Sequence, residues 1–175
     1  MTTIEDLLEL IRTRRSVRKL SSAPLPEGTE EKLLDAFVWA PSGGNKQPWH
    51  IRIIRDPMGK QLLSESSFNQ RTLVDAPVVF VVCADLDRAY AAYKERGRDL
   101  YCVQDTAAGV QNMLLAIHAM GLATCWVGAF NEEKVAEVLA LPKHLRPVAM
   151  LPVGAPLDQP SPPARRPVSE IARVG

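Results

Sequence analysis

The segment Pro77–Ala84, with the sequence PVVFVVCA, restricts the possible folds of this chain more than any other feature. It is apolar without interruption and rich in β-branched residues, which is typical of a strand buried on both faces. Such a strand needs one layer of structure against each of its sides. We therefore expect a central strand that lies between two layers of helices.

Helical and strand-like patterns surround this strand on both sides. Apolar spacing and breaker residues predict helices over 4–13, 29–40, 58–66, 85–97, 99–120 and 131–141, and further strands over 50–55, 124–129 and 146–153. The helix over 99–120 is apolar on most sides, so we expect it in the core, closed by Gly121. Five prolines from Pro156 to Pro167 predict an extended tail.

These patterns predict a single domain over residues 1–175. The 46% hydrophobic content and the length of 175 residues suit one core, and we find no internal repeat. The expected fold class is α+β, with three layers (α/β/α) and a mixed central sheet flanked by helices.

Composition excludes several classes of protein. The net charge of +1 gives no overall field that would favour nucleic acid, and no apolar run is long enough to cross a bilayer. The N-terminus, MTTIEDLLEL, is acidic and unlike a signal peptide, so we expect a cytoplasmic location. Three cysteines without CxxC spacing indicate reduced thiols, and three distant histidines offer no metal site.

The usual catalytic and nucleotide-binding motifs are missing from the sequence. It has neither GxGxxG after a strand nor GxxxxGK[ST], and no spacing that indicates a Ser-His-Asp or Cys-His arrangement. A cofactor that carries the chemistry would explain this shortage of candidate acids and bases.

Three polar or glycine-containing segments are candidates for binding such a cofactor. Arg14–Arg18 (RRSVR) holds three guanidinium groups that suit phosphate oxygens, although a solvated basic turn after a helix would look the same. Ala40–Trp49 (APSGGNKQPW) has two glycines that let the backbone approach a flat ligand, or it is a plain helix-to-strand turn. Gly121–Phe130 (GLATCWVGAF) either presents backbone N–H groups to a ligand or is an ordinary core strand.

The order of these segments is more specific than any one of them. RRSVR, APSGGNKQPW, GLATCWVGAF and a C-terminal ARRPVSEI resemble the nitroreductase family, as do FNQRTLVDAPVVFVVCAD and QDTAAGVQNMLLAIHAMGL between them. The resemblance runs from Leu7 to Ile171. The chain looks like a compact member, in which only the short helix over 85–97 is available as a lid.

The resemblance implies FMN as the cofactor and assigns the residues that bind it. Arg14 and Ser16 would hold the phosphate and ribityl chain, with Arg15 less certain, and Arg165 would reach the phosphate from the tail with Arg166 near it. Arg18 would lie beside the N1–C2=O edge of the flavin, where a fixed cation favours the reduced ring.

Further residues are assigned to the ring by the same resemblance. Asn69 would bond its pyrimidine side, and the backbone N–H of Gly128, with Ala129 beside it, would donate to N5. Gln104 and Asp105 are both candidates for a contact from the core helix. Thr72 stands where some members of the family have a lysine.

The resemblance also implies a homodimer with shared FMN sites, in which Pro41, Ser42 and Asn45 pack against the partner's flavin and the tail packs on the partner. NAD(P)H would reduce the flavin, and an electron-poor acceptor such as a nitroaromatic or quinone would reoxidise it, with no obligatory protein acid or base. A specialised acceptor, or a flavin-binding sensor or storage protein without turnover, is the alternative.

Overall fold

The computed structural model describes residues 3–173 of the chain. The helices are α1 (Ile4–Thr13), α2 (Thr29–Val38), α3 (Pro57–Glu65), α4 (Thr72–Asp75), α5 (Leu86–Arg96), α6 (Cys102–Ala119), α7 (Glu132–Val138) and α8 (Val168–Ile171), with a 3₁₀ turn η1 (Gly43–Asn45) and a π turn η2 (Gly97–Tyr101). The strands are β1 (Trp49–Ile54), β2 (Val78–Asp85), β3 (Ala123–Thr124) and β4 (Leu145–Gly154).

The four strands form one sheet in the order β1-β2-β4-β3, and every pair of neighbours is antiparallel. The α+β class expected from the sequence is therefore confirmed. The expectation of a mixed sheet is wrong, because β1 to β4 pair only in the antiparallel sense; the one parallel pairing within residues 3–173 is an isolated bridge between Ser16 and Thr124. This bridge brings the chain that follows α1 to the outer edge of β3.

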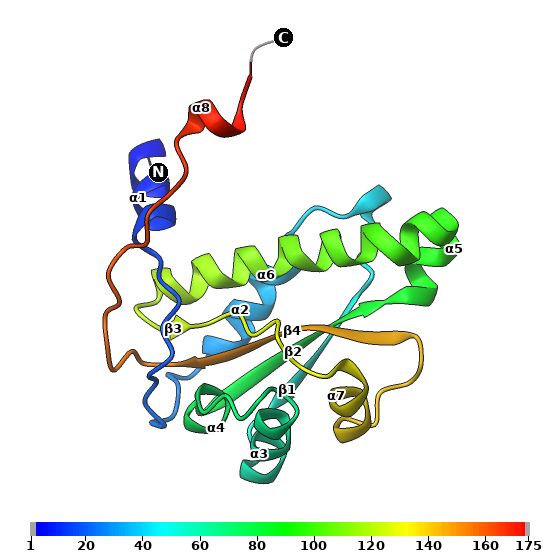
Figure 1. Cartoon of the computed structure of the whole chain (residues 1–175), viewed down its shortest axis with the longest axis horizontal. Coiled ribbons are helices and arrows are strands. Elements are labelled where there is room, and N and C mark those ends of the chain that lie inside the picture. Colours follow the sequence, from blue (N-terminus) through cyan, green and yellow to red (C-terminus); the bar gives the residue numbers. More distant parts are fainter. Residues whose placement is uncertain (1–2, 174–175) are drawn as a thin grey trace.

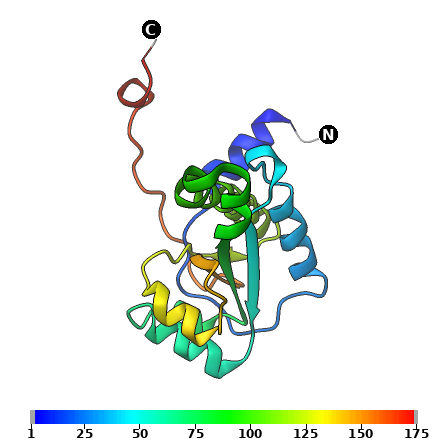
Figure 2. The same cartoon turned by 90° about the vertical axis from the view of Figure 1, so that its right-hand side faces the viewer.

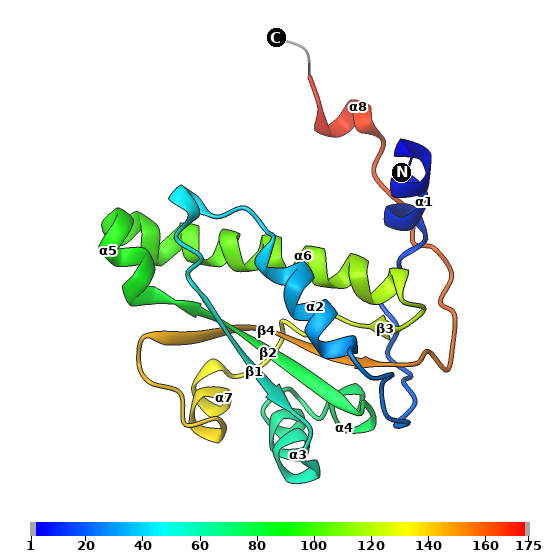
Figure 3. The ribbon, with the colours of Figure 1, turned by 180° about the vertical axis from the view of Figure 1, so that it is seen from behind.

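Helices cover both faces of the sheet, as the buried central strand requires (Figures 1 and 3). Alternate residues of β2 point to opposite faces: Val78, Phe80 and Val82 pack with α2 and α6, whereas Val79, Val81 and Cys83 pack with α3, α4 and α7. These six side chains are 0–2% exposed. The three-layer arrangement predicted from PVVFVVCA thus holds along the whole strand.

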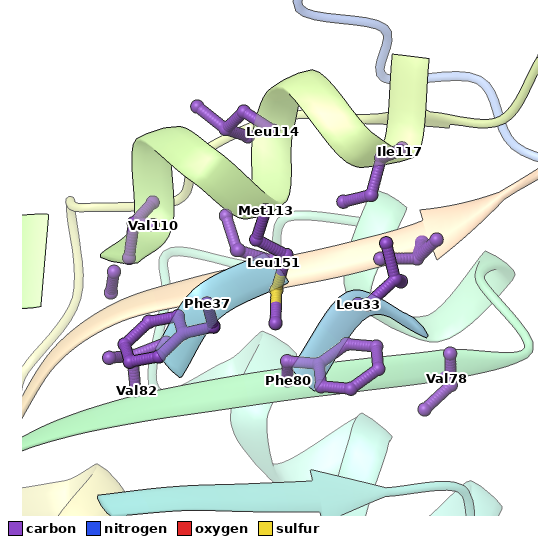
Figure 4. Close-up of a cluster of buried hydrophobic side chains, with 12 residues drawn as sticks. Leu33, Phe37, Val78, Phe80, Val82, Val110, Met113, Leu114, Ile117 and Leu151 are labelled. Carbon is purple, nitrogen blue, oxygen red and sulfur yellow. The ribbon is translucent and has the colours of Figure 1, made fainter. Parts of the chain in front are cut away.

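The larger core lies between α2, α6 and the sheet (Figure 4). Phe37 is fully buried there, and its ring meets Trp49 edge-on at a centroid distance of 5.4 Å. A Cβ atom on Gly109 would lie 2.6–2.7 Å from the ring carbons of Phe37. The absence of a side chain at Gly109 therefore allows α6 to approach α2 closely.

Several element boundaries differ from the sequence predictions. The strand predicted over 124–129 is reduced to β3, after which only Val127 rejoins the sheet, through its bridge to Met150. The helix predicted over 99–120 begins with the π turn η2 and becomes α-helical at Cys102. The helix predicted over 29–40 ends at Val38, and the tail predicted as extended contains the short helix α8.

The two ends of the chain project away from the three layers (Figures 1 and 2). No residue of α1 is buried, and its four large apolar side chains, Ile4, Leu7, Leu8 and Ile11, are 37–59% exposed. The tail from 161 to 173 is exposed throughout. Within residues 3–173 no helix is both long and apolar enough to cross a membrane.

We predict that Gly109→Ala destabilises the protein, although alanine is the better helix former by about 1 kcal/mol. The added methyl group would overlap the Phe37 ring, and overpacking of a core typically costs about 1–3 kcal/mol. Denaturant unfolding should show a lower free energy of unfolding for this variant, and Gln111→Ala, on the exposed side of α6, should change it by less than about 0.5 kcal/mol. Equal or higher stability of Gly109→Ala would contradict this account of the α2–α6 contact.

Candidate functional site

The arginine segment Arg14–Arg18 leaves α1 and runs beside β3. The N–H of Val17 donates to the carbonyl of Thr124 at 3.0 Å, which fixes the segment against the strand. The guanidinium of Arg15 donates to the carbonyl oxygens of Arg12 and Arg14 at 2.6 and 2.9 Å, so it closes the C-terminus of α1. In residues 3–173, no carboxylate lies within 4.0 Å of the Arg14 or Arg18 guanidinium, and both cations remain unneutralised.

A cavity of about 550 Å³ opens beside this segment. Its wall includes Arg14, Thr124, His118 at the end of α6, and residues 156–160 of the tail. The Thr124 hydroxyl and one carboxylate oxygen of Asp158 are buried and have no hydrogen-bond partner in the described chain. A cavity lined by Arg14 and Arg15 can bind an anionic ligand.

His118 joins the end of α6 to the end of α1. Its Nε2 lies 2.9 Å from the Thr13 hydroxyl, which places the arginine segment next to the cavity. Burial lowers the pKa of His118, and the charges of Arg14 and Arg15 lower it further, so the ring is neutral near pH 7. The sequence reasoning missed His118, because a lone histidine on a core helix gives no local signal.

A second group of predicted residues meets in the segment that follows β3. The Gln70 side chain donates to the carbonyl of Ala129 at 3.1 Å, which brings the loop that carries Asn69 to the segment of Gly128 and Ala129. Asn69 and its neighbour Phe68 both have positive φ angles, +58° and +56°. Such conformations are strained in non-glycine residues and are common at binding sites.

The Gly128–Ala129 segment is open to a ligand. Both residues are exposed, and the N–H of Gly128 has no hydrogen-bond acceptor within residues 3–173. Trp126 is 39% exposed between buried Cys125 and Val127, and a side chain on Gly128 would come within 3.6 Å of its ring nitrogen. Trp126 was not predicted as a site residue, although its outward position follows from the alternation in this segment.

The loop Pro41–Asn45 lies far from the arginine segment, at the other end of α6. Both carboxylate oxygens of Asp105 lie 3.2 Å from the N–H of Gly43, whereas Arg14 is next to His118. Asp105 and His118 are thirteen residues apart, or about 20 Å along a helix axis. A single chain therefore does not bring Pro41, Ser42 and Asn45 to the predicted phosphate-binding residue Arg14.

The two glycines of this loop have a different role from the one predicted. The Tyr93 ring packs over them: a Cβ atom on Gly43 would lie 3.3 Å from its edge, and one on Gly44 would overlap its hydroxyl. Gly44 also has a φ of +54°. Gly43 and Gly44 thus allow a tyrosine of the same chain to approach the loop, where the sequence interpretation placed a flat ligand.

The polar side chains of the loop hold its shape. The Ser42 hydroxyl accepts the N–H of Gln47 at 3.0 Å, and the Gln47 side chain donates to Asn45 at 3.1 Å. Of the two candidates on α6, Asp105 bonds the loop and Gln104 is exposed. The loop is therefore fixed by contacts within its own chain.

The tail arginines do not line the cavity beside Arg14 in the single chain. Arg165 and Arg166 lie in the exposed tail that leaves the body of the molecule (Figure 2), and Arg166 pairs with Glu170 at 3.2 Å. Thr72 is buried in α4 and its hydroxyl has no partner in the described chain.

Known proteins share both this fold and this sequence. The model of the nitroreductase family matches residues 11–71 and 58–155. The chain belongs to the nitroreductase family. The family predicted from the order of the sequence segments is thereby confirmed.

Similar proteins come from several bacteria. The chain is 31% identical over 185 residues to an NADH dehydrogenase of Thermus thermophilus, covering 90% of each chain, and 30% identical over 168 residues to an FMN reductase (NADPH) of Bacillus subtilis, covering 89% of this chain and 68% of that one. A nitroreductase family protein of Clostridium difficile has a similar structure, with a TM-score of 0.84, 32% identity, and coverage of 95% and 96%. The names of the first two describe oxidoreductases that use NADH or NADPH, the class expected for this chain.

We predict that Asp105→Asn raises stability most at neutral pH. Burial raises the pKa of Asp105 and the N–H of Gly43 only partly offsets this, so the ionised carboxylate is disfavoured in the folded protein. The stabilisation that the protonated carboxyl provides is complete below its ordinary pKa of 3.8 and is lost as the pH rises through the raised value. An asparagine oxygen can still accept from Gly43 without carrying a charge.

The melting temperatures of both proteins at pH 4 and pH 7 test this prediction. The difference in favour of Asp105→Asn should be larger at pH 7, and Asp35→Asn, on the exposed side of α2, should show no such change. A variant that melts lower than the parent at pH 7 would show that the charged form stabilises the loop.

Proposed function

We propose that the chain is an FMN-dependent oxidoreductase that takes a hydride from NAD(P)H and reduces an electron-poor acceptor, such as a nitroaromatic or a quinone. The observation that carries this proposal is the placement of two unneutralised arginines beside β3 and of an unpaired backbone N–H in the segment that follows β3. Arg14 and Arg18 supply the charge that a phosphate and a reduced flavin need, and Gly128 supplies a donor.

The residues present fit FMN. The basic cavity beside Arg14 is lined by polar residues such as Thr124, Asp158 and Gln159, which suit a ribityl chain, and the open segment at Gly128 suits a planar ring. When bound, FMN would supply the N5 atom that receives the hydride and later passes electrons to the acceptor. NAD(P)H and the acceptor would use the same face in turn.

The chain's own residues then bind and orient the reactants. Arg14 and Ser16 hold the phosphate end, with Arg15 fixing the turn, and Arg18 stabilises negative charge at the pyrimidine edge. Asn69 bonds that edge, and the backbone N–H of Gly128, next to Ala129, donates to N5 and so positions the ring. A proton-transferring side chain is unnecessary in this scheme, because preorganised donors and positioning are sufficient.

The proposed assembly is a homodimer with two shared sites. The loop Pro41–Asn45 lies about 20 Å from the arginine segment along α6, so an antiparallel pair of α6 helices would bring the partner's loop to each flavin. The exposed apolar face of α1 and the exposed Leu157, Val168 and Ile171 of the tail supply area for a second copy. We expect an obligate interface of more than about 2,000 Å², with the tail, Arg165 and Arg166 packed on the partner.

The purified protein should carry FMN and be bleached by NADH or NADPH. Acid release followed by chromatography identifies the flavin, and anaerobic absorbance at the flavin band follows reduction and its reversal by an acceptor. Released FAD, or protein without flavin, would overturn the proposed function. Bound FMN that neither nicotinamide reduces would identify a flavin-binding sensor or storage protein instead.

Arg165→Ala should weaken FMN binding by roughly 1.5–3 kcal/mol, the range for a hydrogen bond to a charged group. Flavin fluorescence during titration of the apoprotein gives the dissociation constant. Arg173→Ala, which removes an equally exposed cation from the same tail, should leave it unchanged.

Sedimentation across a wide dilution range should show the dimer for the parent and for both tail variants. Unchanged FMN affinity in Arg165→Ala would contradict the assignment of the tail to the phosphate. A stable monomer that carries stoichiometric FMN would contradict the shared-site geometry.

A further inference from the structure

Aromatic and cationic side chains gather where α5 meets η2. We name this group the tyrosine–cation cluster; its members are Tyr90, Tyr93, Lys94, Arg96, Arg98 and Tyr101. The Tyr93 and Tyr101 rings meet edge-on at 5.3 Å, the Arg96 guanidinium lies 5.3 Å from the centre of the Tyr101 ring, and Lys94 and Arg98 lie 5.5 and 5.7 Å from that of Tyr90. Each tyrosine therefore contacts a cation or another ring.

The cluster touches the loop that is proposed to reach the partner's flavin. Tyr93 packs on Gly43 and Gly44, and the Tyr101 ring approaches Gly43 from the η2 side. If Pro41–Asn45 contacts the partner's cofactor, the tyrosine–cation cluster must lie at the edge of that flavin site. This step rests on the proposed function and its shared sites.

Two cations of the cluster have no acidic partner. Arg98 pairs with Asp99 at 2.9 Å, which neutralises it. Lys94 and Arg96 have no carboxylate within 4.0 Å among residues 3–173. Arg96 donates through Nε to the Tyr101 hydroxyl at 2.9 Å, which orients its guanidinium and leaves the terminal nitrogens as donors.

The backbone that carries Lys94 and Arg96 is strained. Lys94 has a φ of +53° and a ψ of −141°, which is strained for a residue with a side chain. A Cβ atom on Gly97 would overlap the carbonyl oxygen of Ala89, so only glycine permits the chain to fold back at this point. The strained turn presents Lys94 and Arg96 together beside the tyrosine rings.

We propose that the tyrosine–cation cluster binds the anionic group of an aromatic redox substrate at the partner's flavin, with Arg96 as the specificity-determining residue. A planar substrate stacks beside the tyrosine rings, and its carboxylate or phosphate accepts hydrogen bonds from the terminal nitrogens of Arg96. Anionic aromatic acceptors are therefore preferred over neutral ones of the same shape. A phosphate of the nicotinamide dinucleotide has the same chemistry and is the other source of such an anion.

The test compares Arg96→Gln with the parent holoprotein. Glutamine keeps a donor for Tyr101 and removes the charge. The acceptor pair is 4-nitrobenzoate and 4-nitrobenzamide, which differ in charge and little in shape, and a second arm compares NADPH with NADH. Arg52→Gln, an exposed cation on β1 outside the cluster, is the matched control.

Arg96→Gln should lower kcat/KM at least about tenfold for 4-nitrobenzoate, the loss expected for one charge-assisted contact, and less than about twofold for 4-nitrobenzamide. Calorimetric titration of the oxidised holoprotein with 4-nitrobenzoate should show the same weakening of the dissociation constant without turnover. Arg52→Gln should change neither quantity. If Arg96→Gln instead lowers kcat/KM for NADPH but not for NADH, and leaves 4-nitrobenzoate unaffected, the anion site is also supported and the dinucleotide is identified as its ligand.

An equal loss for the anionic and neutral compounds, or no loss in either arm, would overturn the inference. The FMN content and the rate of bleaching by NADH separate this failure from a failure of the proposed function. Parent protein that carries reducible FMN but binds both nitro compounds equally, together with no selective loss for NADPH in Arg96→Gln, would refute the anion site alone. Parent protein without flavin would refute the proposed function itself.

Discussion

Burial of β2 on both faces is the constraint on which the rest of the structure depends. Removing its apolar side chains from water is favourable only if each face of the sheet is covered, and α2 with α6 covers one face while α3, α4 and α7 cover the other. The missing side chain at Gly109 lets the first layer close over the Phe37 ring. With both faces occupied, the polar binding segments lie at the edges and ends of the sheet.

The length of α6 sets the distance between these segments. At one end of the helix, His118 contacts Thr13, which directly precedes the arginine segment. At the other end, Asp105 contacts the loop Pro41–Asn45, called the glycine loop below. The core requires a long apolar helix across the sheet, and the same helix separates groups that our proposal assigns to a single flavin. Stability of the fold and division of the site between two copies would then have one structural cause.

Local pattern predicted the central strand, the core helix and the segments that carry the candidate site. The helix predicted over 131–141 begins where expected, because the side chain of Asn131 accepts the N–H of Lys134 at 2.9 Å and caps α7. It failed where contacts distant in sequence decide the structure. An apolar run at 124–129 does not reveal that the segment pairs with β4 only through β3 and a single bridge at Val127. A glycine pair at 43–44 does not reveal the tyrosine about fifty residues later that packs on it.

The glycine loop is held by Asp105, Tyr93 and its own Ser42 and Asn45, all in one chain. The contacts within one chain thus fix the loop's conformation. In the proposed dimer, the loop would therefore lose little conformational entropy when two chains associate. Dimerisation would resemble the docking of two rigid bodies at this point of contact, and folding upon binding would be confined to the exposed tail. Subunit exchange should accordingly be limited by release of the tail, while the loop keeps its shape in the separated chains.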